Sequence, residues 1–441
     1  MKTFSLGGVH PHDSKLSRAV EITQAPMPTV VEILLAQHIG APAKAVVKKG
    51  DTVKVGDLIG ESGGFVSANI HSSVSGTVTA VDTSMDSSGV RKPSVTIRVE
   101  GDEWREEIDQ SETLIEKCEL SPKEIVQKVA QSGIVGLGGA TFPSHVKLGI
   151  PAGKTAEALV VNGVECEPYL TADHRLMLER SGEIIVGCQI VMKAIGVGKC
   201  YIGVENNKPD AIATLQKAAT EGIEIVPLKV QYPQGGEKQL IDAAMGRRVP
   251  SGALPIEVGA VVQNVGTIYA IYQAVQKNRP IIDRVVTVTG KKVASPKNML
   301  TRIGTPLNLL IEECGGEPEG TAKIINGGPM MGRAVSTPTA PVTKGTSGVL
   351  LMDKKESKRK AESVCISCAK CVSVCPMGLE PYLMYKLTKA GVMDRLEAEK
   401  ITDCIECGCC SFTCPATLPL LDYIRIGKGK TMQLIRSRQT K

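Results

Sequence analysis

Between residues 121 and 275 the chain alternates short apolar runs with segments in which apolar residues recur at the helical period. The apolar runs predict β-strands and the amphipathic segments predict α-helices. In chain order they are 159–161 (strand), 174–195 (helix), 201–204 (strand), 209–220 (helix), 223–230 (strand) and 237–245 (helix). Strands that alternate with helices are typical of an α/β layer built on a largely parallel sheet.

The segments on either side of this layer follow other patterns. Residues 41–100 contain short apolar runs separated by turn residues and look like a lipoyl-type β-sandwich. The hairpin that would carry a modifiable lysine reads Ser62-Gly63-Gly64-Phe65, so we expect no swinging-arm chemistry. Residues 381–400 show apolar positions near the helical period and predict helices.

Composition narrows the class of protein. At about 100 to 200 residues per domain, a chain of 441 residues is expected to form three or four domains. Its 42% hydrophobic and 22% charged residues favour a soluble globular protein over a disordered, collagen-like or coiled-coil one. No apolar stretch reaches about 18 residues and the first 14 residues lack an apolar run, so we expect neither a membrane span nor secretion.

Charge and cysteine content restrict the chemistry further. A net charge of +6 and an aromatic content of 3% argue against nucleic acid as a partner. Two basic stretches, 354–360 and 423–441, are either solvated or dock to anionic headgroups or to an acidic partner. The 14 cysteines are not expected to form disulfides in a reducing compartment.

Nine cysteines lie between Cys365 and Cys414, and eight of them form the pattern C-x2-C-x2-C-x3-C-P twice. Three thiolates at this spacing can wrap one cubane cluster, while the fourth points to the other cluster. Structural zinc sites also use C-x2-C pairs, but a zinc ion needs only four ligands and does not require the x2, x2, x3-Pro spacing twice over. We therefore predict two [4Fe–4S] clusters, the first held by Cys365, Cys368, Cys371 and Cys414, the second by Cys404, Cys407, Cys410 and Cys375. The ninth, Cys409, is expected to be a packed thiol.

Two glycine-rich segments, 136–143 and 232–237, punctuate the α/β layer. Backbone N–H groups freed by glycine at a helix start can bind an anion such as the phosphate of a nucleotide or flavin. Neither segment is a Rossmann fingerprint, because Thr141 stands where the last glycine would be. Each could equally be a tight turn.

The segment 162–168 directly follows a predicted strand. The carboxyl edge of an open α/β sheet is where ligands bind, and its amide and carboxylate groups can bond ribose hydroxyls or a nicotinamide amide. The alternative is a polar turn with solvated Glu165 and Glu167, and with Cys166 as a buried small residue.

These segments, together with 262–265, resemble in order the FMN- and NADH-binding motifs of the flavoprotein subunit of respiratory complex I. The chain is still more similar to the C subunits of Rnf-type electron-transport complexes, and this resemblance covers nearly its whole length. It includes the opening segment Gly7-Gly8-Val9-His10-Pro11-His12 and both cysteine motifs.

The resemblance implies a site for noncovalent FMN and for NAD(H) as substrate. The residues it would use are Gly136, Gly138, Gly139, Phe142, Lys147, Asn162, Glu165, Glu167, Tyr232, Gly235, Gly236, Glu237 and Asn264. Complex I has two acidic residues where this chain has Gly236 and Glu237, and an acidic residue where it has Val164. The flavin site is therefore better supported than the details of nucleotide binding.

The resemblance also implies the organisation of the whole chain. We expect an α/β multidomain protein with an N-terminal region containing a lipoyl-like β-sandwich, a parallel-sheet FMN/NAD(H)-binding domain, a small β-grasp domain and a helical two-cluster ferredoxin-like domain, at 1–120, 121–280, 281–350 and 351–441. It would be a peripheral, cytoplasm-facing part of a membrane complex that couples ferredoxin and NAD redox to Na+ or H+ transport. Its partners would be membrane-spanning and ferredoxin-like subunits.

Two alternatives remain open. A soluble flavin and iron–sulfur reductase, such as the cobalamin reductases of catabolic microcompartments, shares this layout. A relay or scaffold subunit that has lost its flavin would keep only the clusters.

Overall fold

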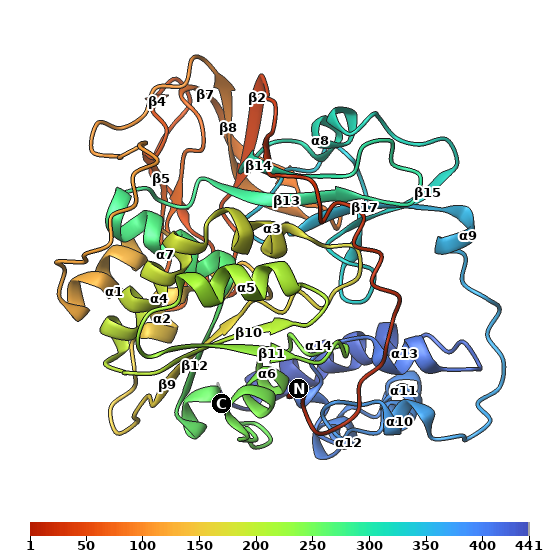
Figure 1. The fold of residues 1–441 in the computed structure, drawn as a ribbon. Helices are drawn as coiled ribbons and strands as arrows, with labels where there is room; N and C mark the ends of the chain where they lie inside the picture. Colours follow the sequence, from red (N-terminus) through yellow and green to blue (C-terminus); the bar gives the residue numbers. More distant parts are fainter. Residues whose placement is uncertain (440–441) are drawn as a thin grey trace.

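A parallel four-stranded sheet lies at the centre of the computed structural model, which describes residues 1–439 (Figure 1). Its strands stand in the order β11-β10-β9-β12, with bounds Ile223–Leu228, Cys200–Glu205, Ala158–Asn162 and Ala260–Asn264. Along β9, Leu159 and Val161 face one layer of helices and Val160 faces the other. All three are fully buried, as expected for a parallel strand that is covered on both faces.

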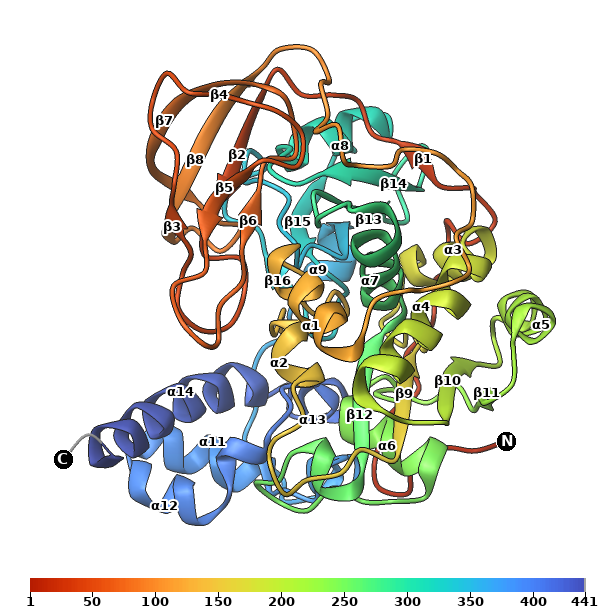
Figure 2. The ribbon, with the colours of Figure 1, turned by 90° about the vertical axis from the view of Figure 1, so that its left-hand side faces the viewer.

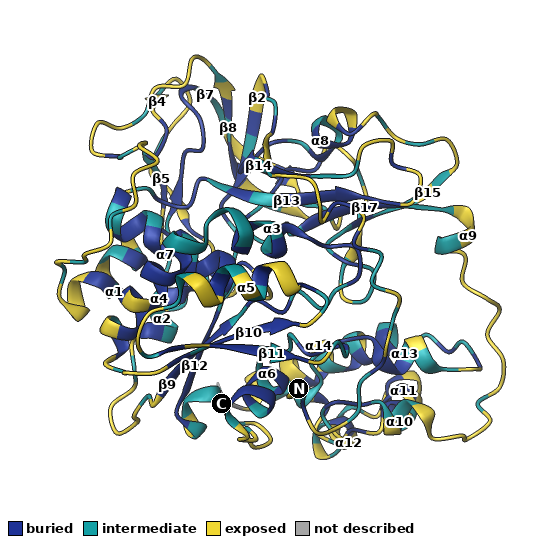
Figure 3. Ribbon diagram, in the orientation of Figure 1, coloured by how far each residue is buried: buried dark blue, intermediate teal, exposed yellow. Residues whose placement is uncertain are grey.

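The helices of this parallel unit (residues 121–280) cover both faces of the sheet (Figure 3). They are α1 (Pro122–Gln131), α2 (Ser144–Leu148), α3 (Ala172–Glu179), α4 (Ser181–Ile195), α5 (Pro209–Ala218), α6 (Glu237–Met245) and α7 (Val265–Lys277), with the 3-10 turn η1 (Pro255–Val258). Ser121 and Glu124 form a capping box that starts α1. The predicted helix at 174–195 is two helices, since the chain leaves the helical conformation at Arg180.

The sandwich unit (β2–β8) consists of a sheet in the order β2-β8-β7-β4 and a three-stranded sheet, β3-β5-β6. The strands are β2 (Val30–Leu34), β3 (Lys44–Ala45), β4 (Thr52–Val53), β5 (Leu58–Glu61), β6 (Ile70–His71), β7 (Gly76–Met85) and β8 (Arg91–Val99). The predicted region 41–100 thus lacked the strand β2, which pairs along its whole length with β8.

The mixed unit (residues 281–353) is a six-stranded sheet in the order β1-β14-β13-β17-β15-β16. Its elements are β13 (Asp283–Thr289), β14 (Lys297–Arg302), α8 (Leu307–Glu313), β15 (Thr321–Asn326), β16 (Arg333–Ala334) and β17 (Gly348–Asp353), joined by β1 (Thr23–Gln24) from the start of the chain. The N-terminal region is therefore not confined to the sandwich unit, because β1 completes a sheet that lies 250 or more residues away in sequence.

The cysteine unit (residues 354–439) is helical, as predicted. It contains α9 (Lys354–Ser357), α10 (Lys370–Ser373), α11 (Pro381–Ala390), α12 (Met393–Ala398), η2 (Ile401–Asp403), α13 (Cys409–Thr413) and α14 (Leu420–Gln439). Figure 2 shows α14 alongside α11 and α12. The basic stretch 423–441 is thus mainly a packed helix rather than a loose tail, with residues 440–441 outside the described part of the chain.

Within residues 1–439 no helix combines the length and the apolar character needed to cross a membrane.

Candidate flavin site and iron–sulfur centres

The carboxyl edge of the parallel sheet brings the predicted flavin residues together. Neighbouring strands β9 and β12 are in register, and both end in asparagine, Asn162 beside Asn264. The Asn162 side-chain amide donates to the carbonyl of Gly235 at 2.8 Å. The Asn264 amide donates to the Asp173 carboxylate at 2.7 Å. Segments 162–168, 232–237 and 262–265, distant in sequence, therefore meet at one edge.

Lys147 enters the same edge from α2. Its ammonium lies 2.6 Å from the carboxylate of Glu237, the first residue of α6, and donates to the carbonyl of Val262 at 3.2 Å. Both charged side chains are about one-third exposed, so the ion pair borders solvent. A cation so placed can bind an anionic group of a ligand at this edge.

The glycine-rich segment 136–143 closes on itself through a hydrogen bond of 2.9 Å from the Gly136 N–H to the carbonyl of half-buried Phe142. Gly138 must lack a side chain, because a Cβ there would lie 2.5 Å from the Asn264 amide nitrogen. Gly139 faces open space, with no atom within 4 Å of such a Cβ. The segment thus passes close to Asn264 and leaves exposed backbone beside it.

Glu165 and Glu167 are engaged by backbone donors. The Glu165 carboxylate accepts hydrogen bonds from the N–H groups of Asp173 and His174, at 2.8 and 3.2 Å, at the start of α3. The Glu167 carboxylate accepts from the N–H groups of Met330 and Met331, at 3.1 and 2.7 Å. Burial raises the pKa of Glu167 to about 7.

The 232–237 loop also reaches the cysteine unit. The Tyr232 hydroxyl donates to the carbonyl of Cys407 at 2.8 Å, and the residue as a whole is 2% exposed. Three residues on, the Gly235 N–H points at the thiol of Cys166, with 3.4 Å between nitrogen and sulfur. Gly236 is the N-cap of α6. One short loop therefore contacts the predicted flavin residues at one end and a predicted cluster ligand at the other.

The predicted ligands of the second cluster line one cavity in the cysteine unit: Cys375, Cys404, Cys407 and Cys410. Cys409 lines it too, but its thiol is fully buried and points to the carbonyl of Tyr232 at 3.9 Å. The remaining wall is apolar and includes Met384, Leu421 and Ile424. A cavity that collects four thiols from both motifs in apolar surroundings fits a cubane.

The predicted ligands of the first cluster lie nearer the surface. Cys365, Cys371 and Cys414 are half-buried against the apolar core of the cysteine unit, whereas Cys368 is exposed. Among residues 1–439, no three His, Cys, Asp or Glu side chains are arranged to hold a single metal ion. The second set thus lines one cavity, whereas the first set lies at the edge of the same core.

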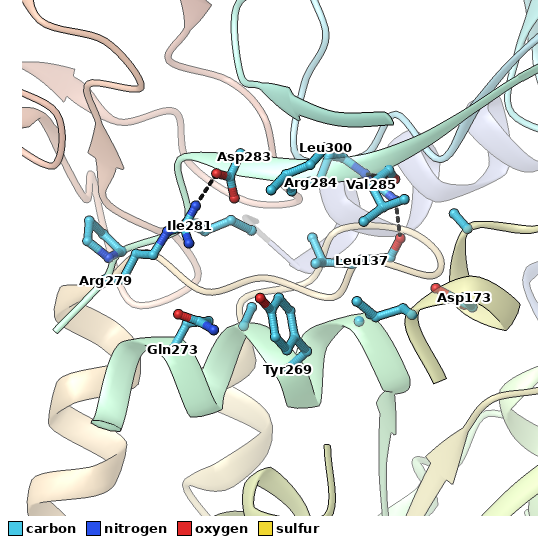
Figure 4. A pocket seen from close by; sticks show the side chains of 15 residues that line it. Leu137, Asp173, Tyr269, Gln273, Arg279, Ile281, Asp283, Arg284, Val285 and Leu300 are labelled. Atoms are coloured by element: carbon cyan, nitrogen blue, oxygen red, sulfur yellow. Dashed lines mark hydrogen bonds and ion pairs between the residues drawn. The ribbon is translucent and has the colours of Figure 1, made fainter. Parts of the chain in front are cut away.

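Another cavity, shown in Figure 4, lies between α7 and β13 and contains none of the thirteen predicted flavin or nucleotide residues. It is lined by Leu137, Asp173, Tyr269 and Arg284 among others. Burial and the neighbouring Glu165 raise the pKa of Asp173 to about 7, and burial lowers the pKa of Arg284 to about 10. Leu137 of the glycine-rich segment forms part of its wall, and residues of the mixed unit such as Arg284 form another part.

Sequence reasoning missed two residues that organise the site. The Asp173 carboxylate accepts a hydrogen bond from the Asn264 amide. Asp173 lies in the first turn of α3 and belongs to none of the sequence motifs, so no sequence signal pointed to it. The ammonium of Lys15, which is 9% exposed, donates to the carbonyls of Glu165, Glu167 and Leu170 at 2.8, 2.9 and 2.6 Å. Only the fold reveals this lysine, because it lies 150 residues before the loop that it holds.

Four family models match the chain in the order of its units. They are the RnfC barrel sandwich hybrid domain (2–102), the Nuo51 FMN-binding domain (129–273), the SLBB domain (285–334) and the 4Fe-4S dicluster domain (357–415). The C subunit of the Na(+)-translocating ferredoxin:NAD(+) oxidoreductase complex of Acetobacterium woodii is 45% identical over 96% of this chain and 96% of its own length. The chain belongs to the RnfC family.

Other RnfC relatives are also similar over most of their length. The C subunit of the proton-translocating ferredoxin:NAD(+) oxidoreductase complex of Clostridium ljungdahlii is 48% identical over 87% of this chain and 84% of its own. The C subunit of the ion-translocating oxidoreductase complex of Rhodobacter capsulatus is 41% identical over 98% of this chain and 84% of its own. The family assignment confirms the predicted resemblance and disfavours the soluble-reductase alternative.

As an RnfC protein, the chain is a subunit of an ion-translocating ferredoxin:NAD+ oxidoreductase complex. The matched FMN-binding and dicluster domains confirm the predicted fold class, and the SLBB match covers the predicted β-grasp region. Among solved structures, an NAD+-reducing [NiFe]-hydrogenase is similar at 21% identity and a TM-score of 0.47, over 63% of this chain and 54% of that chain.

Proposed function

We propose that this RnfC chain exchanges electrons between NAD(H), a noncovalent FMN and two [4Fe–4S] clusters, as part of a complex that couples ferredoxin and NAD redox to Na+ or H+ transport. When bound, FMN exchanges hydride with nicotinamide and single electrons with iron–sulfur clusters. The observation that supports this most directly is the 232–237 loop, which contacts Asn162 at one end and the Cys407 carbonyl at the other.

The chain's own residues would bind and orient the cofactor. Lys147 and the exposed backbone of Gly138 and Gly139 offer positive charge and N–H donors for the FMN phosphate, while Asn162 and Asn264 offer amides. Phe142 would provide an aromatic face for the flavin ring. Gly136, Glu165, Glu167, Tyr232, Gly235, Gly236 and Glu237 complete the proposed pocket, part of them through the backbone. We assign no acid, base or nucleophile.

The two clusters would act in sequence. The second set, Cys375, Cys404, Cys407 and Cys410, lies beside Tyr232 and thus next to the flavin loop. The first set, Cys365, Cys368, Cys371 and Cys414, lies farther toward the surface, where Cys368 is exposed. Electrons would pass between flavin and partner subunits through the second cluster and then the first, in a direction set by the potentials.

The remaining proposals concern location and organisation. We place the chain peripherally, on the cytoplasmic side of the membrane, against membrane-spanning and ferredoxin-like subunits of the same complex. The proposed limits of its four domains are 1–120, 121–280, 281–350 and 351–441.

The decisive experiment is to reconstitute the full chain with FMN, iron and sulfide and to record its visible spectrum before and after adding NADH. We expect bound FMN, about eight iron atoms per chain, as two cubanes require, and rapid bleaching of both chromophores. Two clusters without flavin and without a response to NADH would support the relay alternative instead. Fast reduction of cob(II)alamin would support the reductase alternative.

A further inference from the structure

The first 20 residues form a strap that joins the parallel unit to the cysteine unit (Figure 1). At its start the Lys2 carbonyl accepts a hydrogen bond of 2.9 Å from the N–H of Lys229, just beyond β11. The Thr3 hydroxyl then lies 3.1 and 2.9 Å from the side-chain oxygens of Gln231 and Gln234. The strap thereby follows the 232–237 loop, which carries the proposed flavin residues.

Between Gly7 and Val9 the strap touches both units at once. The Gly8 N–H donates to the carbonyl of Val374 at 2.9 Å, directly before the proposed cluster ligand Cys375. The next residue, Val9, pairs with Tyr232 through two backbone hydrogen bonds of 2.8 and 2.9 Å. Two adjacent residues of the strap therefore bind the cluster side and the flavin side of one boundary.

Gly7 marks the closest approach. Its φ is +70°, and a Cβ there would lie 2.6 Å from the Val374 oxygen and 2.7 Å from both the carbonyl carbon and oxygen of Cys375. These neighbours are backbone atoms that no rotamer change can move. A side chain at this position must push the strap and the Cys375 loop apart.

Gly8 is confined from the opposite side. Its φ is +95°, and a Cβ would lie 2.8 Å from both the Gln231 amide nitrogen and the Phe4 ring, and 3.0 Å from the Tyr232 carbonyl oxygen. Because Gly7 and Gly8 have no side chains, only the backbone of the strap separates the parallel unit from the cysteine unit here. Val9 is buried with Tyr232, Cys407 and Cys409 in one apolar cluster, which holds this arrangement in place.

We propose that the strap is a positioning element, in which Gly7 fixes how closely the Cys375 side of the second cluster approaches the Tyr232 loop of the flavin site. This inference rests on the proposed function, because it assumes that flavin and cluster exchange electrons across this boundary. Each transfer would move one electron from the reduced flavin anion (FMNH−), which hydride transfer from NADH leaves, to an oxidised cluster. Two transfers, one for each cluster, would return it to FMN and release one proton to solvent.

The test is the Gly7→Ala variant of the full chain, reconstituted with FMN, iron and sulfide. In stopped-flow experiments NADH should reduce its flavin at the wild-type rate, because the added Cβ meets the backbone of Val374 and Cys375 and no proposed pocket residue. Transfer from flavin to clusters should slow by roughly tenfold or more, since displacements on the order of 1 Å from a productive geometry already reduce rates strongly. FMN and iron content are measured on the same sample.

The matched control is Gly50→Ala in the sandwich unit. Gly50 has a φ of +96° and no atom within 4 Å of an added Cβ, so its variant carries the same kind of backbone strain without the contact. It should transfer electrons at the wild-type rate. An unchanged rate in Gly7→Ala, or equal slowing in Gly50→Ala, would overturn the proposal.

A second variant covers the case in which Gly7→Ala does not assemble. Thr3→Val removes the hydroxyl that lies against Gln231 and Gln234 without straining the backbone, and should slow the same transfer to a smaller degree. Wild-type transfer in that variant would then count against the proposal. Photoreduction of the flavin starts the transfer without NADH, so failure of the NADH reaction and failure of the strap remain distinguishable.

Discussion

At the scale of single residues, spacing along the chain predicted the position of Cys375 but not the partners of the carboxylates Glu165 and Glu167. The structure places Cys375 in the cavity of the other motif, as the C-x3-C-P pattern predicts. By contrast, the Glu165 carboxylate accepts from a backbone N–H eight positions away in the sequence, and the Glu167 carboxylate accepts from one 163 positions away. The proposed role of each cysteine follows from its spacing to nearby cysteines in the sequence, whereas the partner of a carboxylate depends on which loops the fold brings together.

We predict that Cys375→Ser removes the second cluster selectively, because it deletes one of the four thiols in that cavity. Iron should fall from about eight to about four atoms per chain, while FMN is retained. Cys409→Ser is the matched control, since Cys409 lines the same cavity but is not a predicted ligand. Iron analysis and the visible spectrum check both, and equal losses would contradict the ligand assignment.

We predict that Gly138→Ala weakens FMN binding, because the new Cβ would lie 2.5 Å from the Asn264 amide nitrogen. Overpacking of this kind costs roughly 1–3 kcal/mol, which corresponds to about tenfold or more in the dissociation constant. FMN release followed by flavin fluorescence measures it. Gly198→Ala, at the amino end of β10 and with no atom within 4 Å of the added Cβ, should bind FMN as the wild type does.

At the scale of elements, the parallel layer was predicted well and its helix boundaries less well. The strands β9 and β10 and the helix α6 lie where the apolar pattern placed them. The break at Arg180 was missed, because neither proline nor glycine marks the residue at which the chain leaves the helical conformation. Helix α14 was treated as a basic stretch, although its inner side packs on the cysteine unit and supports the second motif.

We predict that Lys428→Gln in α14 lowers the reduction potential of the second cluster. The Lys428 ammonium donates to the carbonyl of Cys404 at 2.7 Å and pairs with Glu406 at 3.2 Å, so its loss removes positive charge beside a proposed ligand. The expected shift is on the order of 50 mV, the one-electron equivalent of roughly 1 kcal/mol. A redox titration measures it, and the exposed Lys430→Gln should leave the potential unchanged.

At the scale of the whole molecule, buried polar contacts hold the units together. The Lys344 ammonium, in the mixed unit, donates at 2.8 Å to the carbonyls of Asn69 in the sandwich unit and Gly133 in the parallel unit. Lys344 is 1% exposed, so water cannot replace these hydrogen bonds to its ammonium group. Three units therefore meet at one amino group, whose partners are separated from it by 275 and 211 positions in the sequence.

We predict that this lysine makes stability depend on pH. Burial lowers the pKa of Lys344 to about 7, below its ordinary value of 10.5, so the unfolded chain binds the proton more tightly. The free energy of unfolding is therefore highest, as far as Lys344 contributes, above the ordinary pKa of 10.5, where the lysine is neutral in both states. This contribution is lost as the pH falls toward 7. Between pH 7 and 9 wild-type stability should rise by up to about 1.4 kcal/mol per pH unit more than that of Lys344→Met.

Thermal unfolding across this pH range, compared between wild type and variant, checks the prediction. The matched control is Lys49→Met, at a lysine of the sandwich unit that lies on the surface, which should follow the wild-type pH dependence. A Lys344→Met variant that follows it equally closely would show that Lys344 keeps its ordinary pKa.

The sequence by itself determined the fold class, the glycine-rich segments and the eight proposed cluster ligands, because periodicity and ligand spacing are local properties of the chain. Only the tertiary structure decided that Gly7 and Gly8 separate Tyr232 from Cys375, that Lys15 holds the 165–170 loop, and that β1 completes a distant sheet. These contacts join residues 150 or more positions apart. No local pattern specifies them, since they depend on how separately folded units pack together.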